Sequence, residues 1–137
     1  MSFVLDASMT LACLFEDESV EATADLMARI VESGATVPGI WRLEVANGLR
    51  TSVRRRRCTE DYAREALDDL RRLPITTDLE TDARAWNDIL ALSDVENLTP
   101  YDASYLELAV RLGAALASCD AALIAAARRR GVDVLTV

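Results

Sequence analysis

Residues 3–6 constrain the fold more than any other segment of this chain. Phe3, Val4 and Leu5 form a continuous apolar run that is too short for a helix, and Asp6 follows it directly. A run of this kind is typical of a strand buried on both faces, as in a parallel sheet covered by helices. Open parallel sheets bind ligands just beyond the carboxyl ends of their strands. We therefore expect Asp6 to lie at a sheet edge where binding sites occur.

Further along the chain, short apolar runs alternate with longer segments of helical periodicity. Strands are expected at residues 35–37, 75–77, 114–118 and 132–137. Helices are expected at residues 8–15, 19–31, 40–57, 59–73, 79–92, 99–112 and 120–130, with Ser19, Thr59 and Thr99 as N-caps. Strands separated by helices imply a parallel sheet with right-handed crossovers and helices on both faces. The predicted fold class is therefore α/β, a three-layer α/β/α sandwich in one domain covering residues 1–137.

The charged residues exclude several kinds of chemistry. All 15 basic residues are arginine, and the chain contains neither lysine nor histidine. This removes a P-loop lysine, a Schiff-base lysine, a histidine general base and a histidine metal ligand. The net charge of −8 also argues against the sequence-independent nucleic-acid binding of a broadly basic surface. Any catalysis must therefore use carboxylates, hydroxyls, thiols or a bound ion.

The cysteines indicate a reducing environment. Cys13, Cys58 and Cys119 are odd in number and lack the spacing of a disulfide framework. No apolar signal or membrane-spanning segment precedes them. We therefore expect a cytoplasmic protein that does not contact a membrane.

Four acids occupy positions that an α/β fold can bring together, namely Asp6, Glu44, Asp102 and Asp120. Asp6 and Asp120 can also cap the helices that follow them, and Asp102 can complete a capping box with Thr99. Glu44 lies among apolar residues of a helix, where a carboxylate is costly unless it is paired or bound to a metal. If the four acids cluster, they raise one another's pKa values and form a site for hard divalent cations.

Four sequence segments resemble the PIN-domain ribonucleases, specifically the VapC-type toxins of bacterial and archaeal toxin–antitoxin pairs. In the family's order, they are VLDAS around Asp6, LEVANGL around Glu44, TPYDASYLELA around Asp102, and ASCDAALIAAA around Asp120 followed by GVDVLTV. The resemblance implies a PIN-like sandwich whose four acids converge at the C-terminal edge of the sheet and bind Mg²⁺, which Mn²⁺ can replace. It also implies that RNA is hydrolysed by a metal-activated water, leaving a 5′-phosphate and a 3′-hydroxyl.

The same resemblance indicates supporting residues. Ser8 and Ser118 match positions where the family often carries a hydroxyl near the site. Asn47 lies one helical turn beyond Glu44, so it can orient that carboxylate or a metal-bound water.

Two further expectations concern RNA and a protein partner. Arg50 and residues 54–57 lie at the C-terminal end of an expected helix, where cations favourably meet the helix dipole. A solvated cap explains them, and RNA contact by Arg50 and Arg54 is the alternative. The resemblance implies a VapB-like antitoxin, whose arginine can bridge two carboxylates of the site. We expect a homodimer whose acids are blocked by the antitoxin's C-terminal segment, lying in a groove between helices.

Two other classes of protein compete with this interpretation. A receiver-type signalling domain is also a small α/β fold with an acidic magnesium pocket. It normally needs an adjacent acidic pair after the first strand and a lysine late in the chain, and this sequence has neither. A catalytically silent PIN-like binding module would carry the same motifs, and a metal-dependent RNA cleavage assay separates it from the enzyme.

Overall fold

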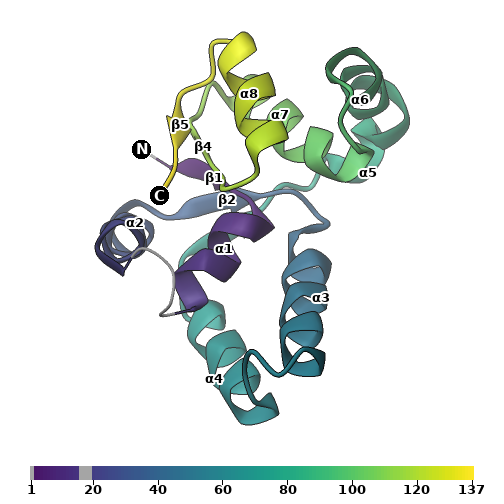
Figure 1. The fold of residues 1–137 in the computed structure, drawn as a ribbon. Coiled ribbons are helices and arrows are strands. Elements are labelled where there is room, and N and C mark those ends of the chain that lie inside the picture. Colours follow the sequence, from purple (N-terminus) through teal and green to yellow (C-terminus); the bar gives the residue numbers. More distant parts are fainter. Residues whose placement is uncertain (1, 16–19) are drawn as a thin grey trace.

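Five short strands form one parallel sheet at the centre of the computed structural model, which describes residues 2–15 and 20–137 (Figure 1). The strands are β1 (Phe3–Leu5), β2 (Ala35–Val37), β3 (Ile75–Thr77), β4 (Leu116–Ala117) and β5 (Val134–Leu135). Their order is β3-β2-β1-β4-β5, and each neighbouring pair is parallel. The chain therefore adds strands first on one side of β1 and then on the other. The strand order reverses between β1 and β4.

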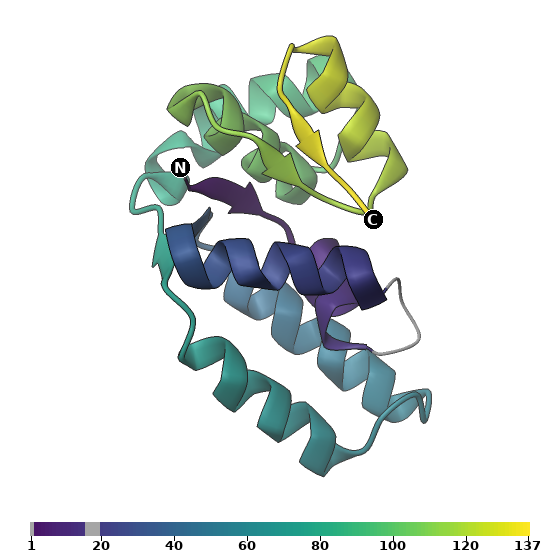
Figure 2. The same cartoon turned by 90° about the vertical axis from the view of Figure 1, so that its left-hand side faces the viewer.

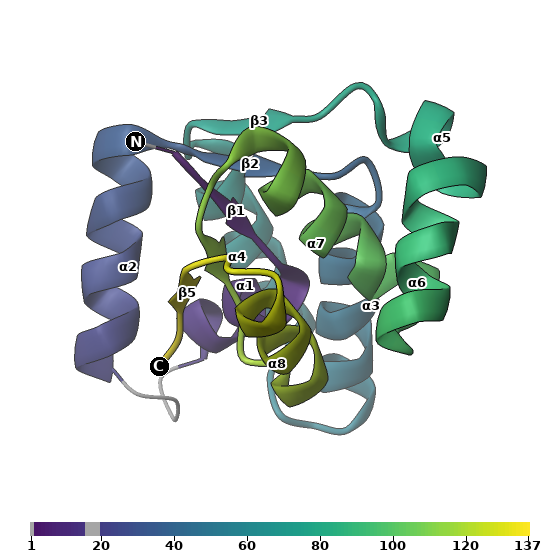
Figure 3. The ribbon, with the colours of Figure 1, turned by 90° about the horizontal axis from the view of Figure 1, so that it is seen from above.

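Helices cover both faces of this sheet (Figures 1 and 2). One side carries α1 (Ala7–Leu14), α2 (Val20–Ser33), α3 (Trp41–Arg54) and α4 (Glu60–Arg71), and the other carries α7 (Pro100–Leu112) and α8 (Ala121–Arg129). After β3, the chain forms α5 (Thr81–Arg84), a π-helical turn (Ala85–Ile89) and α6 (Leu90–Glu96). The π-helical turn and α6 pack against α7. Seen from above, α5 and α6 lie at the opposite end of the molecule from α2 (Figure 3). The predicted three-layer α/β/α sandwich is confirmed.

The strand β1 and the helix α7 form the centre of the hydrophobic core. All three residues of β1 are at most 1% exposed, which agrees with a strand covered on both faces. In α7, every residue from Ala103 to Ala109 is buried. Side chains at the ends of these two elements are therefore held by close packing. Within residues 2–15 and 20–137, every helix is too short or too polar to cross a membrane.

The helical segment after β3 differs from the continuous helix expected at residues 79–92. It begins at Thr81 and continues to Glu96, where Asn97 adopts a left-handed conformation with φ of 54°. The middle of the segment, Ala85–Ile89, is the π-helical turn. Turns of this type are rare and occur frequently at functional sites. The predicted bounds were wrong because apolar periodicity reveals neither the π turn nor the left-handed Asn97 that ends the segment.

Other predicted bounds were too long. The helix α3 ends at Arg54 rather than at residue 57, because Arg56 adopts a left-handed conformation with φ of 60°. The strands predicted at residues 114–118 and 132–137 are only β4 and β5. Backbone hydrogen bonding to β1 nevertheless extends beyond β4, since the Val4 amide donates to the Ala115 carbonyl at 2.9 Å. The expected cap at Ser19 lies outside the described residues.

Candidate metal centre

The four predicted acids come from the ends of four elements of the fold. Asp6 directly follows β1, and Asp120 lies three residues after the last residue of β4. Glu44 and Asp102 lie in the first turns of α3 and α7. The charges of the other three acids all raise the pKa of Asp102, so the structure brings the four within electrostatic range of one another. This acid cluster lies where the strand order reverses, which is where open parallel sheets bind ligands.

Asp6 is the most buried member of the acid cluster, with only 3% of its surface exposed. Its Oδ1 accepts hydrogen bonds from the Met9 amide and the Ser8 hydroxyl, each at 2.8 Å. Its Oδ2 accepts from the Ser118 hydroxyl at 2.5 Å. Burial raises the pKa of Asp6 above its usual value, the charge of Asp120 adds to this effect, and the three hydrogen-bond donors oppose it. Asp6 therefore caps α1 and is also a carboxylate held in place at the sheet edge.

Two serines connect Asp6 to the turn that follows β4. The Ser118 hydroxyl donates to Asp6 and accepts from the Asp120 amide at 3.0 Å. The Ser8 hydroxyl donates to Asp6 and accepts from the Cys119 amide at 2.9 Å. This pairing follows from the register of the sheet, because Leu5 and Ala117 are partners in β1 and β4. The serines therefore fix the carboxylate of Asp6 relative to the backbone that carries Asp120.

Glu44 has a partner that the sequence interpretation missed. The Tyr105 hydroxyl donates to Glu44 Oε1 at 2.6 Å, joining α7 to the first turn of α3. The Tyr105 side chain is 1% exposed. Burial, followed by the hydrogen bond to Glu44, raises the pKa of Tyr105, so this hydroxyl stays protonated and acts as a donor. In the sequence, Tyr105 fits the apolar pattern of α7, and its position three residues after Asp102 is the only hint of this contact.

Asp102 and Asp120 both take part in helix starts. Asp120 caps α8, because its Oδ1 accepts from the Leu123 amide at 2.9 Å. The Thr99 hydroxyl caps α7 by accepting from the Asp102 amide at 3.1 Å. In the described part of the chain, no bond returns from the Asp102 carboxylate to the Thr99 amide, so the expected capping box is only half formed. Burial and the neighbouring carboxylates raise the pKa of Asp102 from 3.8 to about 6.

Asn47, Arg50 and Arg54 lie exposed along α3. Their spacing of three and four residues places them on one face of the helix. Among the described residues, no hydrogen bond joins Asn47 to Glu44. Orientation of a metal-bound water by Asn47 therefore stays a prediction, as does RNA contact by the two arginines.

The chemistry of the acid cluster fits a hard divalent cation. Carboxylate oxygens are the ligands that Mg²⁺ and Mn²⁺ prefer, and a cation would relieve the mutual repulsion that raises the pKa of Asp102. Among residues 2–15 and 20–137, no three acidic or cysteine side chains are close enough to complete an ion site by themselves. Mg²⁺ usually takes one or two carboxylates and fills its other positions with water or substrate phosphate. The acid cluster therefore suits a partly hydrated ion.

Comparisons with known sequences agree with this geometry. The PIN domain family model matches residues 3–129. Two curated relatives are a VapC ribonuclease of Mycobacterium bovis and ribonuclease VapC9 of Mycobacterium tuberculosis. Each is 35% identical to this chain over 119 residues, which cover 85% of the chain and 84% of the relative.

Solved structures share the fold. PAE2754 from Pyrobaculum aerophilum matches with a TM-score of 0.67 and 22% identity, over 98% of this chain and 91% of that protein. A chain in the structure of VapBC2 from Rickettsia felis, bound to a DNA fragment from their promoter, matches with a TM-score of 0.68 and 12% identity. That match covers 100% of this chain and 99% of the other. At these identities, the two structures support the fold alone.

Proposed function

The chain belongs to the PIN domain family, within its VapC group, and from this membership we infer that it is the ribonuclease toxin of a toxin–antitoxin pair. The observation that carries this inference is the acid cluster at the reversal of strand order. Its members are the residues that the family resemblance indicates, namely Asp6, Glu44, Asp102 and Asp120. RNA is the proposed substrate, and hydrolysis of its phosphodiester bonds is the proposed reaction.

The acid cluster holds Mg²⁺, or Mn²⁺ in its place, in this proposal. When bound, the cation supplies a water of lowered pKa and neutralises charge on the scissile phosphodiester. Ser8 and Ser118 hold Asp6 so that its oxygens keep one orientation. Tyr105 fixes Glu44 in the same way. With a pKa of about 6, Asp102 is mainly ionised at neutral pH and is therefore available as a ligand.

The composition of the chain supports a metal-dependent reaction over a metal-free one. Ribonucleases that use the 2′-hydroxyl as nucleophile need a general base and acid, a role for which histidine and lysine are suited. This chain has neither residue. Attack by water then leaves a 5′-phosphate and a 3′-hydroxyl, as the family resemblance implies.

The exposed face of α3 gives the RNA a positive surface to follow. Arg50 and Arg54 lie on this face beyond Asn47, and Glu44 lies at the start of the same helix. Each residue adds 1.5 Å along a helix, so Arg54 is roughly 15 Å from Glu44 along the axis. Phosphates on either side of the cleaved bond can therefore meet these arginines.

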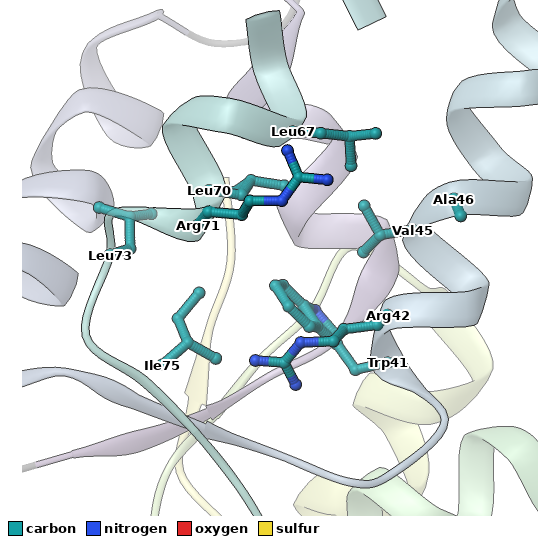
Figure 4. Close-up of a pocket in the computed structure, with 9 residues that line it drawn as sticks. All are labelled: Trp41, Arg42, Val45, Ala46, Leu67, Leu70, Arg71, Leu73 and Ile75. Atoms are coloured by element: carbon teal, nitrogen blue, oxygen red, sulfur yellow. The ribbon is translucent and has the colours of Figure 1, made fainter. Parts of the chain in front are cut away.

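A groove between α3 and α4 is the proposed binding site for the antitoxin's C-terminal segment. It has a volume of about 380 Å³ and is lined mainly by apolar side chains. Figure 4 shows Trp41 and Val45 of α3 on one side of this groove and Leu67 and Leu70 of α4 on the other. The indole N–H of Trp41 donates to the Thr10 hydroxyl at 3.0 Å, so this side of the groove is fixed. An apolar peptide segment fits this shape.

Charged side chains near the groove indicate how the antitoxin segment is oriented in it. The guanidinium groups of Arg42 and Arg71 border the groove and favour acidic residues in the bound segment (Figure 4). Glu44 precedes Val45 on α3, so a segment leaving the groove reaches the acid cluster within a few residues. An arginine at that point can bridge two carboxylates and compete with the cation. The inhibited toxin is proposed to be a homodimer with one antitoxin segment on each subunit.

Calorimetric titration with Mn²⁺ tests the site directly. The wild-type protein is expected to bind the ion, and Asp6→Asn to bind it more weakly because a carboxylate is lost. Asp133→Asn, which changes an exposed acid outside the cluster, serves as the control. An unchanged affinity in Asp6→Asn would remove Asp6 from the site.

Cleavage of RNA tests the reaction. The purified protein is expected to cleave RNA with Mg²⁺ or Mn²⁺, to stop on addition of EDTA, and to lose activity in Asp102→Asn while remaining folded. Continued cleavage in EDTA would contradict the metal-water mechanism.

Co-expression with the antitoxin tests the inhibition. The complex should not cleave RNA, and cleavage should return when the arginine of the antitoxin segment is replaced by alanine. Full activity in the complex would contradict the inhibition model.

A further inference from the structure

Two aromatic side chains of the chain are largely exposed, and one of them, Tyr101, directly precedes a member of the acid cluster. The two Trp, three Tyr and two Phe residues all lie in the described part of the chain, and most of them are buried or half-buried. The exceptions are Trp86, which is 90% exposed, and Tyr101, which is 57% exposed. Trp86 belongs to the π-helical turn, which packs against α7, and Tyr101 directly precedes Asp102 in α7. A large aromatic side chain exposed beside a cavity indicates a binding surface.

A cavity of about 310 Å³ lies between the starts of α3 and α7 and the helical segment after β3. Tyr101 lines this cavity, and so do Leu43, Asp82, Ala85 and Ile89. Leu43 directly precedes Glu44, just as Tyr101 directly precedes Asp102, so the cavity adjoins two members of the acid cluster.

One hydrogen bond joins two walls of this cavity. The Gly39 amide, before α3, donates to the Thr81 hydroxyl at the start of α5 at 2.9 Å. Within the third wall, the Ser104 hydroxyl donates to the Tyr101 carbonyl of α7 at 2.6 Å. The cavity has a mainly apolar lining, which is the usual character of a small-ligand pocket.

We propose that this cavity binds one unpaired nucleobase of the RNA, which stacks on the ring of Tyr101 beside the scissile phosphate. The proposal rests on the ribonuclease function proposed above. A nucleotide whose phosphate meets Asp102 has its base within reach of the adjacent Tyr101. Proteins commonly bind single-stranded RNA by stacking its bases on aromatic side chains.

The lining carries one charged group. It includes the carboxylate of Asp82 and no cationic side chain among its residues. A carboxylate accepts hydrogen bonds, so Asp82 can pair with an N–H group of the bound base.

An exposed apolar surface can also bind a second copy of the same chain. The nucleobase is favoured because the site is concave and its residues Leu43 and Tyr101 directly precede Glu44 and Asp102, where the scissile phosphate is proposed to bind. The experiment below distinguishes the two occupants.

Fluorescence of 2-aminopurine, whose emission falls when it stacks, tests the proposal. A single-stranded oligoribonucleotide carries this base at one position at a time, and every protein carries Asp102→Asn so that the RNA stays intact. Emission is expected to fall on binding at one position, and Tyr101→Phe to preserve that fall. Tyr101→Ala should abolish it and weaken RNA binding roughly 5- to 100-fold, as expected for loss of one aromatic–base stack. Ala85→Leu, which fills the cavity but keeps the ring, should also abolish it.

The control is Trp86→Ala, because Trp86 is the other exposed aromatic residue but does not line the cavity. It should leave the emission change at that position intact. The proposal is overturned if no position is quenched, if Trp86→Ala alone removes the quenching, or if Tyr101→Ala instead converts a dimer to a monomer in sedimentation. If Asp102→Asn still cleaves RNA, the proposed catalytic site is wrong, and this outcome is separate from the stacking result.

Discussion

Tyr105 and Glu44 lie 61 residues apart in the sequence, and the Tyr105 hydroxyl donates to Glu44 Oε1 at 2.6 Å. This hydrogen bond joins the buried face of α7 to the first turn of α3. Residues that orient a metal ligand typically contribute 10- to 100-fold to metal affinity. Tyr105 is therefore expected to act as a positioning residue for Glu44.

Replacing Tyr105 by phenylalanine removes only this hydroxyl. Tyr105→Phe is expected to weaken Mn²⁺ binding about 10- to 100-fold, because Glu44 loses the donor that fixes it. The matched control is Tyr62→Phe, since the Tyr62 hydroxyl donates to the Leu14 carbonyl. Calorimetry on both variants checks this prediction. Equal metal affinities in the two variants would show that Glu44 needs no orientation by Tyr105.

The Ser118 hydroxyl provides a second test of preorganisation. Ser118→Ala removes the donor to Asp6 and the acceptor for the Asp120 amide. The pKa of Asp6 should rise further, because this hydrogen bond favours its ionised form. Mn²⁺ binding should weaken and require a higher pH. Ser93→Ala is the control, since Ser93 is also buried but donates to the Leu98 carbonyl.

Titration of Mn²⁺ affinity against pH separates these two serines. A shift of the pH profile in Ser118→Ala, but not in Ser93→Ala, is the expected outcome. If both variants lose stability equally and neither shifts the profile, Ser118 has only a packing role.

The raised pKa of Asp102 predicts an effect on stability. Its pKa is about 6 in the folded protein, compared with an ordinary value of 3.8. The folded state therefore binds more protons between these two values, so the contribution of Asp102 to the free energy of unfolding falls as the pH rises through them. In EDTA, Asp102→Asn should be more stable than the wild type at pH 7, and the difference should shrink towards pH 4. Denaturant unfolding at several pH values measures this, and a difference that is independent of pH would contradict the prediction.

The sequence predicts well how strands and helices follow one another along the chain, because buried strands and amphipathic helices have distinct apolar patterns. Residues 3–5, 35–37 and 75–77 were predicted with the bounds that β1, β2 and β3 have. The order of strands within the sheet was not predicted. Periodicity does not reveal which strands are neighbours, and the pairing of β1 with β4 is what brings Ser118 to Asp6 across 112 residues.

The acids themselves illustrate a limit of reasoning from local patterns. A cap and a site residue have the same local signature, and Asp6 and Asp120 prove to be caps that also lie in the acid cluster. The family resemblance was needed to select them. Tyr105 was missed because it follows the apolar pattern of α7, and only the packing of α7 against α3 gives its hydroxyl a partner.

The arginines of α3 give the last prediction, which concerns RNA binding. Arg50 and Arg54 are exposed on one face of the helix, beyond Asn47. For single-stranded RNA, each neutralised phosphate contributes about 0.7 to the slope of log affinity against log salt. If both arginines contact phosphates, Arg50→Ala combined with Arg54→Ala should reduce this slope by about 1.4 and weaken binding at low salt.

A matched control uses two other exposed arginines at a helix C-terminus. Arg71 is the last residue of α4, and Arg72 is its C-cap. Arg71 Nη1 lies 2.5 Å from Asp68 Oδ1, and Arg72 Nη1 lies 3.5 Å from Asp69 Oδ1. Their double alanine variant has the same change in net charge. Fluorescence anisotropy with a labelled oligoribonucleotide, in the Asp102→Asn background so that the RNA stays intact, measures both slopes. Equal changes in the two variants would indicate a general charge effect, and no change in the α3 variant would leave Arg50 and Arg54 as a solvated helix end.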